Sequence, residues 1–371
     1  MIKKQDNNYI TIIIFLFIIS RIIFFSYYFI FTNILYSVHF WHYPNLALCQ
    51  SNDCTFYMSI ARSWYQQCGM DTAFFPATPY LVSLSSKLVN YFVNSRSDSL
   101  IIEAVIFFNQ IFALLSTLLL YNYVAKNYSK IISFWASVIF IFSTEQIYFF
   151  TVYSESLFIL LLLTIMSLLE KKQFFIASIF SAILSMTRAN GFIAALIIVY
   201  QKYKTVKNSN DYLKILLYFM IAISGLLLFL TLLYRSCHDI LSFVHVQQQF
   251  GRKSLNQVLN LNFYQFAKYF LKGNIGDKLA FIFFLIANCY FIKHKKWQDL
   301  RILLLFMLPA LSSLTMISFS RFLLALPQIY IFFGIMINKL NFNNRSIIIL
   351  LILAINCLYF YLLINHSPLI W

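Results

Sequence analysis

Residues 212–234 read YLKILLYFMIAISGLLLFLTLLY, an apolar stretch with a single charge at Lys214. A bilayer core about 30 Å thick takes roughly 20 apolar residues in a helix, so this stretch predicts a transmembrane helix. Similar stretches recur along the chain, and alternating barrel strands of about 10 residues would not produce them. The clearest are residues 9–32, 101–124, 131–150, 152–169, 277–292, 300–318, 322–337 and 346–365, with interrupted ones at 74–93 and 173–200.

These runs predict an all-α polytopic membrane protein, a single transmembrane domain over residues 1–371 with about ten to twelve transmembrane helices. The composition agrees, since 61% hydrophobic and 11% charged residues exclude a water-soluble globule. In a soluble domain, the net charge of +16 would indicate nucleic-acid binding. Here the lysines lie in short breaks between apolar runs. That pattern indicates the positive-inside bias and contact with anionic headgroups, so we expect the bilayer and no nucleic acid as a partner.

The lysine positions also predict the topology. Two lysines near the amino terminus place it in the cytoplasm, so the first run acts as a retained signal anchor and residues 33–73 form the first non-cytoplasmic loop. Within that loop, residues 53–67 carry apolar side chains at helical spacing, which predicts an amphipathic interfacial helix. Residues 235–276 are expected to form a second non-cytoplasmic segment. Residues 173–200 are long for one span, and a break is expected at residues 187–191.

Three of the six cysteines, Cys49, Cys54 and Cys68, share the first loop. A disulfide among them would form if the loop faces an oxidising compartment, and unpaired thiols are the alternative. The chain has no C-x-x-C pair and no cysteine spacing typical of a zinc site. The cysteines therefore predict no metal ligands.

Charged side chains inside a membrane need a reason, because each costs roughly 2.5–3.5 kcal/mol at a helix centre. Arg188 and Arg321 each lie where a non-cytoplasmic helix end is expected. The planar guanidinium fork suits a phosphate or pyrophosphate at that depth. The alternatives are a structural pair with Glu145 or Glu155, and snorkelling to headgroups. Arg21, in the middle of the first run, is interpreted as structural.

Asp53 is the acidic residue with the clearest chemical use. It lies in the first loop, just ahead of the predicted interfacial helix, where a carboxylate could take a proton from an acceptor hydroxyl. A solvated loop acid is the alternative. The chain has no H-E-x-x-H, G-x-S-x-G, Walker or G-x-G-x-x-G motif and no acidic cluster. The sequence therefore predicts no required cofactor and leaves only a divalent cation open.

Six short motifs follow one another over most of the chain. They are NDCTFYMSIA at 52–61, FFPATP at 74–79, YSESLF at 153–158, TRANG at 187–191, FVHVQ at 243–247 with FGR at 250–252, and SRFL at 320–323. In this order they resemble the PIG-V-like mannosyltransferases, which include GPI mannosyltransferase II and its bacterial relatives within the GT-C class of membrane glycosyltransferases. The family usually has Trp before the acid and Gly-Tyr after the helix, where this chain has Asn52 and the sequence Ser63-Trp64-Tyr65.

The resemblance implies a GT-C-like bundle and a hexosyltransferase, expected to use mannose. A polyprenyl- or dolichyl-phosphate sugar would be the donor, and a lipid-linked or glycan hydroxyl the acceptor. Transfer would occur on the non-cytoplasmic face with inversion at the anomeric carbon. The resemblance implies Asp53 as the catalytic base. The residues that it implies for substrate binding are Tyr153, Glu155, Arg188, Asn190, Gln247, Arg252 and Arg321.

The chain is short for the eukaryotic members, which favours a bacterial inner-membrane protein over one of the endoplasmic reticulum. Two other functions stay open. A secondary transporter or lipid flippase would be expected to contain inverted repeats, and none is visible. A non-catalytic membrane subunit would keep its function in an Asp53→Asn variant, and the sequence identifies no partner subunit.

Overall fold

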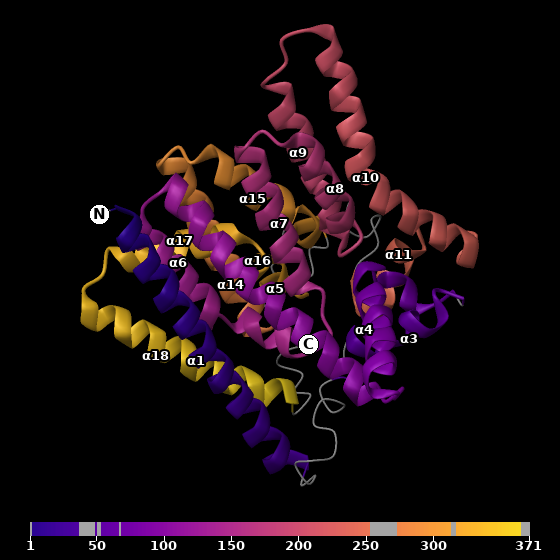
Figure 1. Cartoon of the computed structure of the whole chain (residues 1–371), viewed down its shortest axis with the longest axis horizontal. Helices are drawn as coiled ribbons and strands as arrows, with labels where there is room; N and C mark the ends of the chain where they lie inside the picture. The colour runs from indigo at the N-terminus through magenta and orange to yellow at the C-terminus, as the bar shows by residue number, and fades with distance from the viewer. Residues whose placement is uncertain are drawn as a thin grey trace. The chain divides into compact units, whose positions relative to one another are not determined.

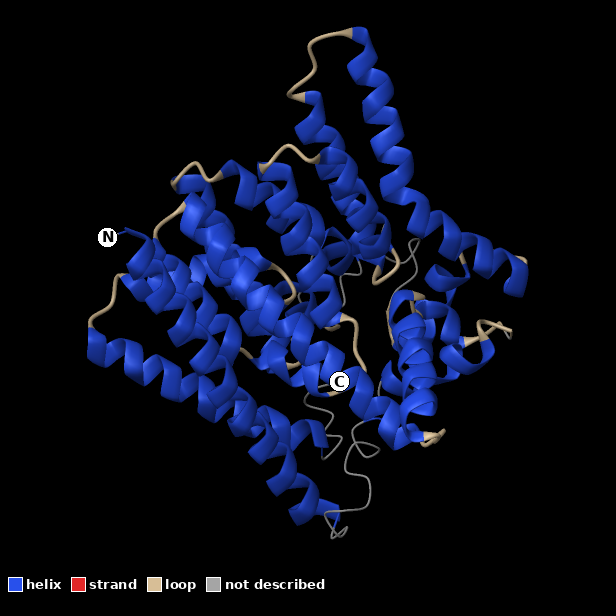
Figure 2. Ribbon diagram, in the orientation of Figure 1, coloured by secondary structure: helices blue, strands red, loops and turns tan. Residues whose placement is uncertain are grey.

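The computed structural model describes residues 2–36, 49, 53–66, 68–252, 273–312 and 317–364. Every regular element in these residues is an α-helix or a short 3-10 helix, as Figure 2 shows, which confirms the all-α fold. The longer elements are α1 (Ile2–Tyr36), α3 (Asp53–Ser63), α4 (Ala77–Val93), α5 (Asp98–Asn127), α6 (Lys130–Phe142), α7 (Glu155–Glu170), α8 (Phe174–Ser185), α9 (Ile193–Tyr203), α10 (Ser209–Cys237), α14 (Ile275–Lys293), α15 (Trp297–Ser312), α17 (Pro327–Asn338) and α18 (Phe342–Ile364). The short ones are η1 (Met70–Ala73), η2 (Thr144–Phe150), η3 (Ala189–Phe192), α11 (Ser242–His245), η4 (Val246–Phe250) and α16 (Phe319–Leu324).

Several helices are long and apolar enough to cross a membrane, which confirms a polytopic membrane protein. Among the described residues five helices meet that test: α5, α10, α14, and the segments Asn8–Tyr27 of α1 and Phe342–Tyr359 of α18. A sixth span results if α6 and η2, which meet at a bend of 52°, are counted together. Other predicted runs form shorter helices such as α8 and α17. They are shorter because turns or 3-10 segments interrupt the apolar runs to which they belong.

The outer face of α10 indicates where lipid contacts the protein. Leu213, Leu216, Leu217 and Met220 are exposed, Leu213 to 70%. A contiguous apolar surface of this kind would be unstable in water and stable against acyl chains. This face of α10 therefore faces the bilayer.

The chain divides into two compact units. Unit 1 comprises Met1–Thr55, Ser85–Leu160 and Leu324–Trp371. In it α6 packs against α1, α5 and α17. Gly334 of α17 lies so close to α6 that a Cβ atom there would be 2.8 Å from the carbonyl oxygen of Ile132. Small residues at such crossings let membrane helices approach closely.

Arg21 joins several elements of unit 1. Its Nη1 donates to Oε1 of Gln110 in α5 (2.8 Å), and its Nη2 donates to Oε1 of Gln146 in η2 (2.7 Å). Its guanidinium carbon lies 4.4 Å from the ring centroid of Phe17. These contacts support the structural role that the sequence indicated for Arg21.

Unit 2 comprises Phe56–Leu84 and Leu161–Leu323. Helices α8, α9 and α10 lie side by side in it (Figure 1). The predicted interruption of residues 173–200 is confirmed, since α8 ends at Ser185, η3 follows, and α9 begins at Ile193. The turn needs glycine at position 191, because a Cβ atom there would lie 2.1 Å from the carbonyl oxygen of Leu184.

Two disulfides involve the first loop. Cys49 pairs with Cys54, which confirms a bridge within the loop. Cys68 instead pairs with Cys237, at the carboxyl end of α10, across a sequence separation of 169. The sequence could not indicate this second partner, because it lies far along the chain. The bridge places residues 68 and 237 on the same side of the membrane.

Candidate active site

Asp53 is the first residue of α3, and the helix begins directly beside the Cys49–Cys54 disulfide. An acidic residue in the first turn interacts favourably with the partial positive charge at the amino end of a helix. The Asp53 side chain is half-buried, whereas Cys54 is fully buried. The bridge therefore fixes the chain at the point where the predicted catalytic acid stands. The helix predicted over residues 53–67 is observed as α3, which ends at Ser63.

Three of the motifs meet in unit 2 through an aromatic cluster. Phe56 of α3 stacks on Phe74 of the FFPATP motif, with ring centroids 4.6 Å apart. Phe250, of the FGR motif, lies 5.8 Å from both rings and nearly perpendicular to them. Such edge-to-face pairs stabilise an aromatic cluster beyond the area that they bury. Motifs far apart in the sequence are thus packed together.

The turn after α3 holds the FFPATP motif. The Tyr65 hydroxyl donates to the carbonyl oxygen of Phe74 (2.7 Å). Burial, with Tyr57 and Asp71 nearby, raises the pKa of Tyr65 well above its usual range, so the hydroxyl stays protonated and remains a donor. Tyr65 is 1% exposed, so its ring is packed inside unit 2.

Trp64 has a backbone conformation that glycine adopts more readily than other residues. Its φ is 48°, and φ of Tyr65 is 59°, so both residues adopt the left-handed conformation. That conformation costs non-glycine residues roughly 1–2 kcal/mol. A glycine that ends a helix in this region avoids the cost. The Ser63-Trp64-Tyr65 turn therefore carries an energetic penalty that glycine would avoid.

Two of the predicted phosphate-binding arginines come together in unit 2. The guanidinium carbon of Arg188 lies 4.9 Å from the ring centroid of Phe322, and that of Arg252 lies 5.9 Å from the same centroid. Arg252 is oriented by Gln247, whose Oε1 accepts from its Nη1 (2.6 Å). Between them, Gly251 has φ of 75°, which tightens the loop that presents Arg252. We call Arg188, Arg252 and Phe322 the arginine pair site.

Arg321 precedes Phe322 in α16, and the start of α16 is held by an acid that the sequence did not single out. Asp277 is 1% exposed, and its Oδ1 accepts from both the backbone N–H and the hydroxyl of Ser320 (2.7 Å each). Asn274 caps α14 and donates to the other carboxylate oxygen of Asp277 (2.9 Å). The pair Asn274 and Asp277, three residues apart before an apolar run, is a helix-start pattern that could have drawn attention to it.

Asn190 has a structural contact. It is fully buried in η3, and its Nδ2 donates to the carbonyl oxygen of Phe306 in α15 (3.3 Å). The turn before η3 is also tied to the FFPATP motif, because the backbone N–H of Ala77 donates to the carbonyl oxygen of Met186 (2.9 Å). The TRANG and FFPATP motifs are therefore adjacent in unit 2.

The YSESLF motif belongs to unit 1. Tyr153 is buried beside Tyr148, with ring centroids 5.2 Å apart, and Glu155 is fully buried at the first position of α7. Asn109 of α5 fixes this stretch, since its Oδ1 accepts from the Ser156 hydroxyl (2.7 Å). Its Nδ2 donates to the carbonyl oxygen of residue 151 (2.8 Å). Asp53 also belongs to unit 1, whereas Arg188, Asn190, Gln247, Arg252 and Arg321 belong to unit 2.

The described residues contain no group of three or more His, Cys, Asp or Glu side chains that could hold a metal ion. The chemistry of the arginine pair site suits an oxyanion. Guanidinium groups bind phosphate oxygens through parallel, charge-assisted hydrogen bonds, and two of them at one ring concentrate positive charge.

Comparison with known protein families gives one match. The sequence model of the family described as Mannosyltransferase (PIG-V) matches residues 41–236, which is more than half of the chain. The matched region includes four of the six motifs, from NDCTFYMSIA to TRANG. The FVHVQ and SRFL motifs lie beyond it. No curated protein sequence matches the chain.

Proposed function

The chain belongs to the PIG-V mannosyltransferase family, and from this premise we propose that it transfers mannose from a polyprenyl- or dolichyl-phosphate donor to a hydroxyl acceptor. The acceptor would be a lipid-linked sugar or a glycan, and transfer would occur on the non-cytoplasmic face. The observation that carries the proposal is the arginine pair site, because two guanidinium groups at one ring suit the phosphate of such a donor. The apolar helices place the protein in a membrane, and we propose the bacterial inner membrane as its location.

In the proposed reaction the acceptor oxygen forms a bond to the anomeric carbon while the bond from that carbon to the phosphate oxygen breaks. Asp53 takes the proton of the acceptor hydroxyl, which is general base catalysis. The lipid phosphate leaves with the bonding electron pair. Its growing negative charge is stabilised by Arg188 and Arg252, and by Arg321, which precedes Phe322 in α16. Attack opposite the leaving phosphate inverts the anomeric configuration.

The other predicted site residues have supporting roles in this proposal. Gln247 orients Arg252 through the hydrogen bond described above. Asn190 holds the TRANG turn, on which Arg188 lies, through its bond to α15. Glu155 and Tyr153 are buried in unit 1, so in this proposal they hold the start of α7 in place. No cofactor has a step in the reaction, since the leaving group remains on its lipid.

The test is transfer of radiolabelled mannose from a polyprenyl-phosphate donor by membranes that contain the wild type, Asp53→Asn or Asp71→Asn. Asp71 is the matched control because it is another acid of the same loop, and an amide oxygen can still accept from its partner Ser59 (2.9 Å). We expect Asp53→Asn to lower transfer by about 10²–10⁴-fold at equal expression, the range for loss of a general base, and Asp71→Asn to retain it. Equal transfer by the wild type and Asp53→Asn would refute the catalytic role and favour a non-catalytic subunit.

A further inference from the structure

A second cationic site lies at the other end of unit 2. Near the end of α9, the Lys204 ammonium group lies 4.5 Å from the ring centroid of Tyr200. The guanidinium carbon of Arg301, in the first turns of α15, lies 4.6 Å from the same centroid. Arg301 also donates a hydrogen bond to the Tyr200 hydroxyl. Two cations from separate helices thus share one phenol ring, and we call these three residues the tyrosine–cation site.

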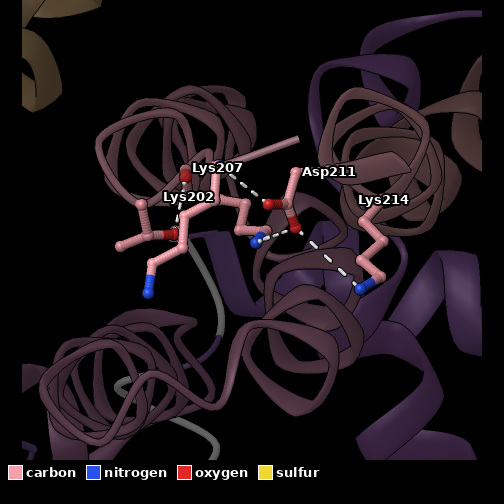
Figure 3. Close-up of polar contacts among 5 residues, drawn as sticks. Lys202, Lys207, Asp211 and Lys214 are labelled. Atoms are coloured by element: carbon pink, nitrogen blue, oxygen red, sulfur yellow. Dashed lines mark hydrogen bonds and ion pairs between the residues drawn. The ribbon is translucent and has the colours of Figure 1, made fainter. Parts of the chain in front are cut away.

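The turn next to this site is rigidly built. Lys202 donates to Oδ1 of Asp211 (2.7 Å), and the backbone N–H of Lys207 donates to Oδ2 (3.0 Å), as Figure 3 shows. Lys214 lies 3.9 Å from the same carboxylate. Asp211 therefore ties the α9–α10 turn to the first turn of α10 and is engaged with these partners. Lys204 and Arg301, by contrast, contact the ring of Tyr200.

The surroundings of the site are those of a membrane interface. Tyr203, Tyr212 and Trp297 are 59%, 56% and 52% exposed. Tyrosine and tryptophan gather at headgroup depth, where the ring meets acyl chains and the polar edge meets water. The exposed apolar face of α10 begins at the same turn with Leu213. A headgroup at that level would meet cations, while its acyl chains would lie along α10.

We propose that the tyrosine–cation site binds the phosphate of an anionic phospholipid. Lys204 and Arg301 supply the charge, and the Tyr200 ring holds both cations in position. The lysine pattern predicts that this end of unit 2 is cytoplasmic, where anionic lipids attract basic segments. The site is independent of the proposed transfer reaction and uses none of its residues.

The test is lipid retention by the purified full chain, measured by native mass spectrometry in mixed micelles with phosphatidylglycerol or phosphatidylcholine. We expect the wild type to retain phosphatidylglycerol at one saturable site and to discriminate against phosphatidylcholine. Each cation near a membrane surface contributes enough for about a fivefold change in affinity, so the double variant Lys204→Gln/Arg301→Gln should retain it about 25-fold less tightly. Lys171→Gln, which removes an exposed cation from the α7–α8 turn, is the matched control.

Three results would overturn the proposal. The first is unchanged phosphatidylglycerol affinity in the double variant. The second is an equal loss in Lys171→Gln, which would indicate only general charge attraction. The third is displacement of the lipid by millimolar inorganic phosphate, which would indicate a site for free anions. If the double variant does not fold, the single variants Lys204→Gln and Arg301→Gln are measured in its place. A loss of about fivefold in phosphatidylglycerol affinity in each supports the proposal, and unchanged affinity in both overturns it.

Discussion

Two arginine sites, one in each unit, use the guanidinium group in different ways. Arg21 in unit 1 is surrounded by acceptors of its own fold, the side chains of Gln110 and Gln146 and a backbone carbonyl of α6. Arg188 in unit 2 shares the ring of Phe322 with a second guanidinium group, that of Arg252. The first arrangement joins helices, whereas the second concentrates positive charge. The contacts of Arg21 are those of an arginine that stabilises the fold, and we propose that the two arginines in unit 2 suit a phosphate ligand.

The largest expected effect is on transfer by Arg188→Gln. Loss of one group that stabilises transition-state charge typically lowers turnover by about 10²–10³-fold. We expect this loss in the mannose transfer assay with little change in thermal stability, since the Gln side chain fits the half-buried position. Equal transfer with lower stability would mean that Arg188 is structural, as Arg21 is.

The opposite outcome is expected for Arg21→Leu. The variant leaves the amide oxygens of Gln110 and Gln146 without their donor, and unsatisfied buried acceptors cost about 1–3 kcal/mol each. Thermal unfolding in detergent should show a loss of about 3 kcal/mol in the free energy of unfolding. Protein that remains folded should still bind the donor. Wild-type stability in Arg21→Leu would contradict the structural interpretation.

Two glycine variants, one in each unit, disturb the packing of helices and leave every arginine in place. They therefore separate effects on stability from effects on phosphate binding. A Cβ atom at Gly225 of α10 would lie 1.9 Å from the carbonyl oxygen of Ala182 in α8. At Gly334 the nearest such contact is 2.8 Å. Overpacking costs about 1–3 kcal/mol, so we expect about 2 kcal/mol or more for Gly225→Ala and less for Gly334→Ala. A larger loss in Gly334→Ala would reverse the order that the contacts predict.

The smallest effect, with the opposite sign, is expected at the turn after α3. Trp64→Gly should raise the free energy of unfolding by about 0.5–1 kcal/mol, since it removes the left-handed strain and loses only a partly exposed side chain. Tyr65→Gly is the control. Tyr65 has a similar φ, but it is buried and donates to Phe74, so its removal should destabilise the protein. Destabilisation by both variants would mean that the Trp64 side chain outweighs the strain.

The helices were predictable because apolar run length and lysine position are local properties of the sequence. The break before Arg188 was predictable for the same reason, since a polar stretch ending in Gly191 interrupts a long run. The number of spans was harder, because α6 and η2 meet at a bend of 52°, and run length alone does not say whether such a pair crosses the membrane as one span.

Much of the candidate site depended on long-range contacts that no local pattern specifies. Arg188 was found because charge is costly in a membrane, and Arg252 through the resemblance to the family. Their shared ring, Phe322, looked like any other apolar residue. The partner of Cys68 and the role of Asp277 in holding Ser320 likewise depend on residues far apart in the chain. These contacts follow from the packing of unit 2.

Affinity for the lipid phosphate itself distinguishes the two arginine sites most directly. Binding of polyprenyl phosphate should be measured for the purified wild type, Arg188→Gln, Arg252→Gln, the double variant and Arg21→Leu. Each single loss at the arginine pair site should weaken binding by about 10-fold or more, since a hydrogen bond to a charged group contributes about 1.5–3 kcal/mol. The double variant should lose less than the two effects combined, because both groups would bind one phosphate, and Arg21→Leu should bind as the wild type does. Unchanged affinity in Arg188→Gln and Arg252→Gln would contradict the assignment of this site to the donor phosphate.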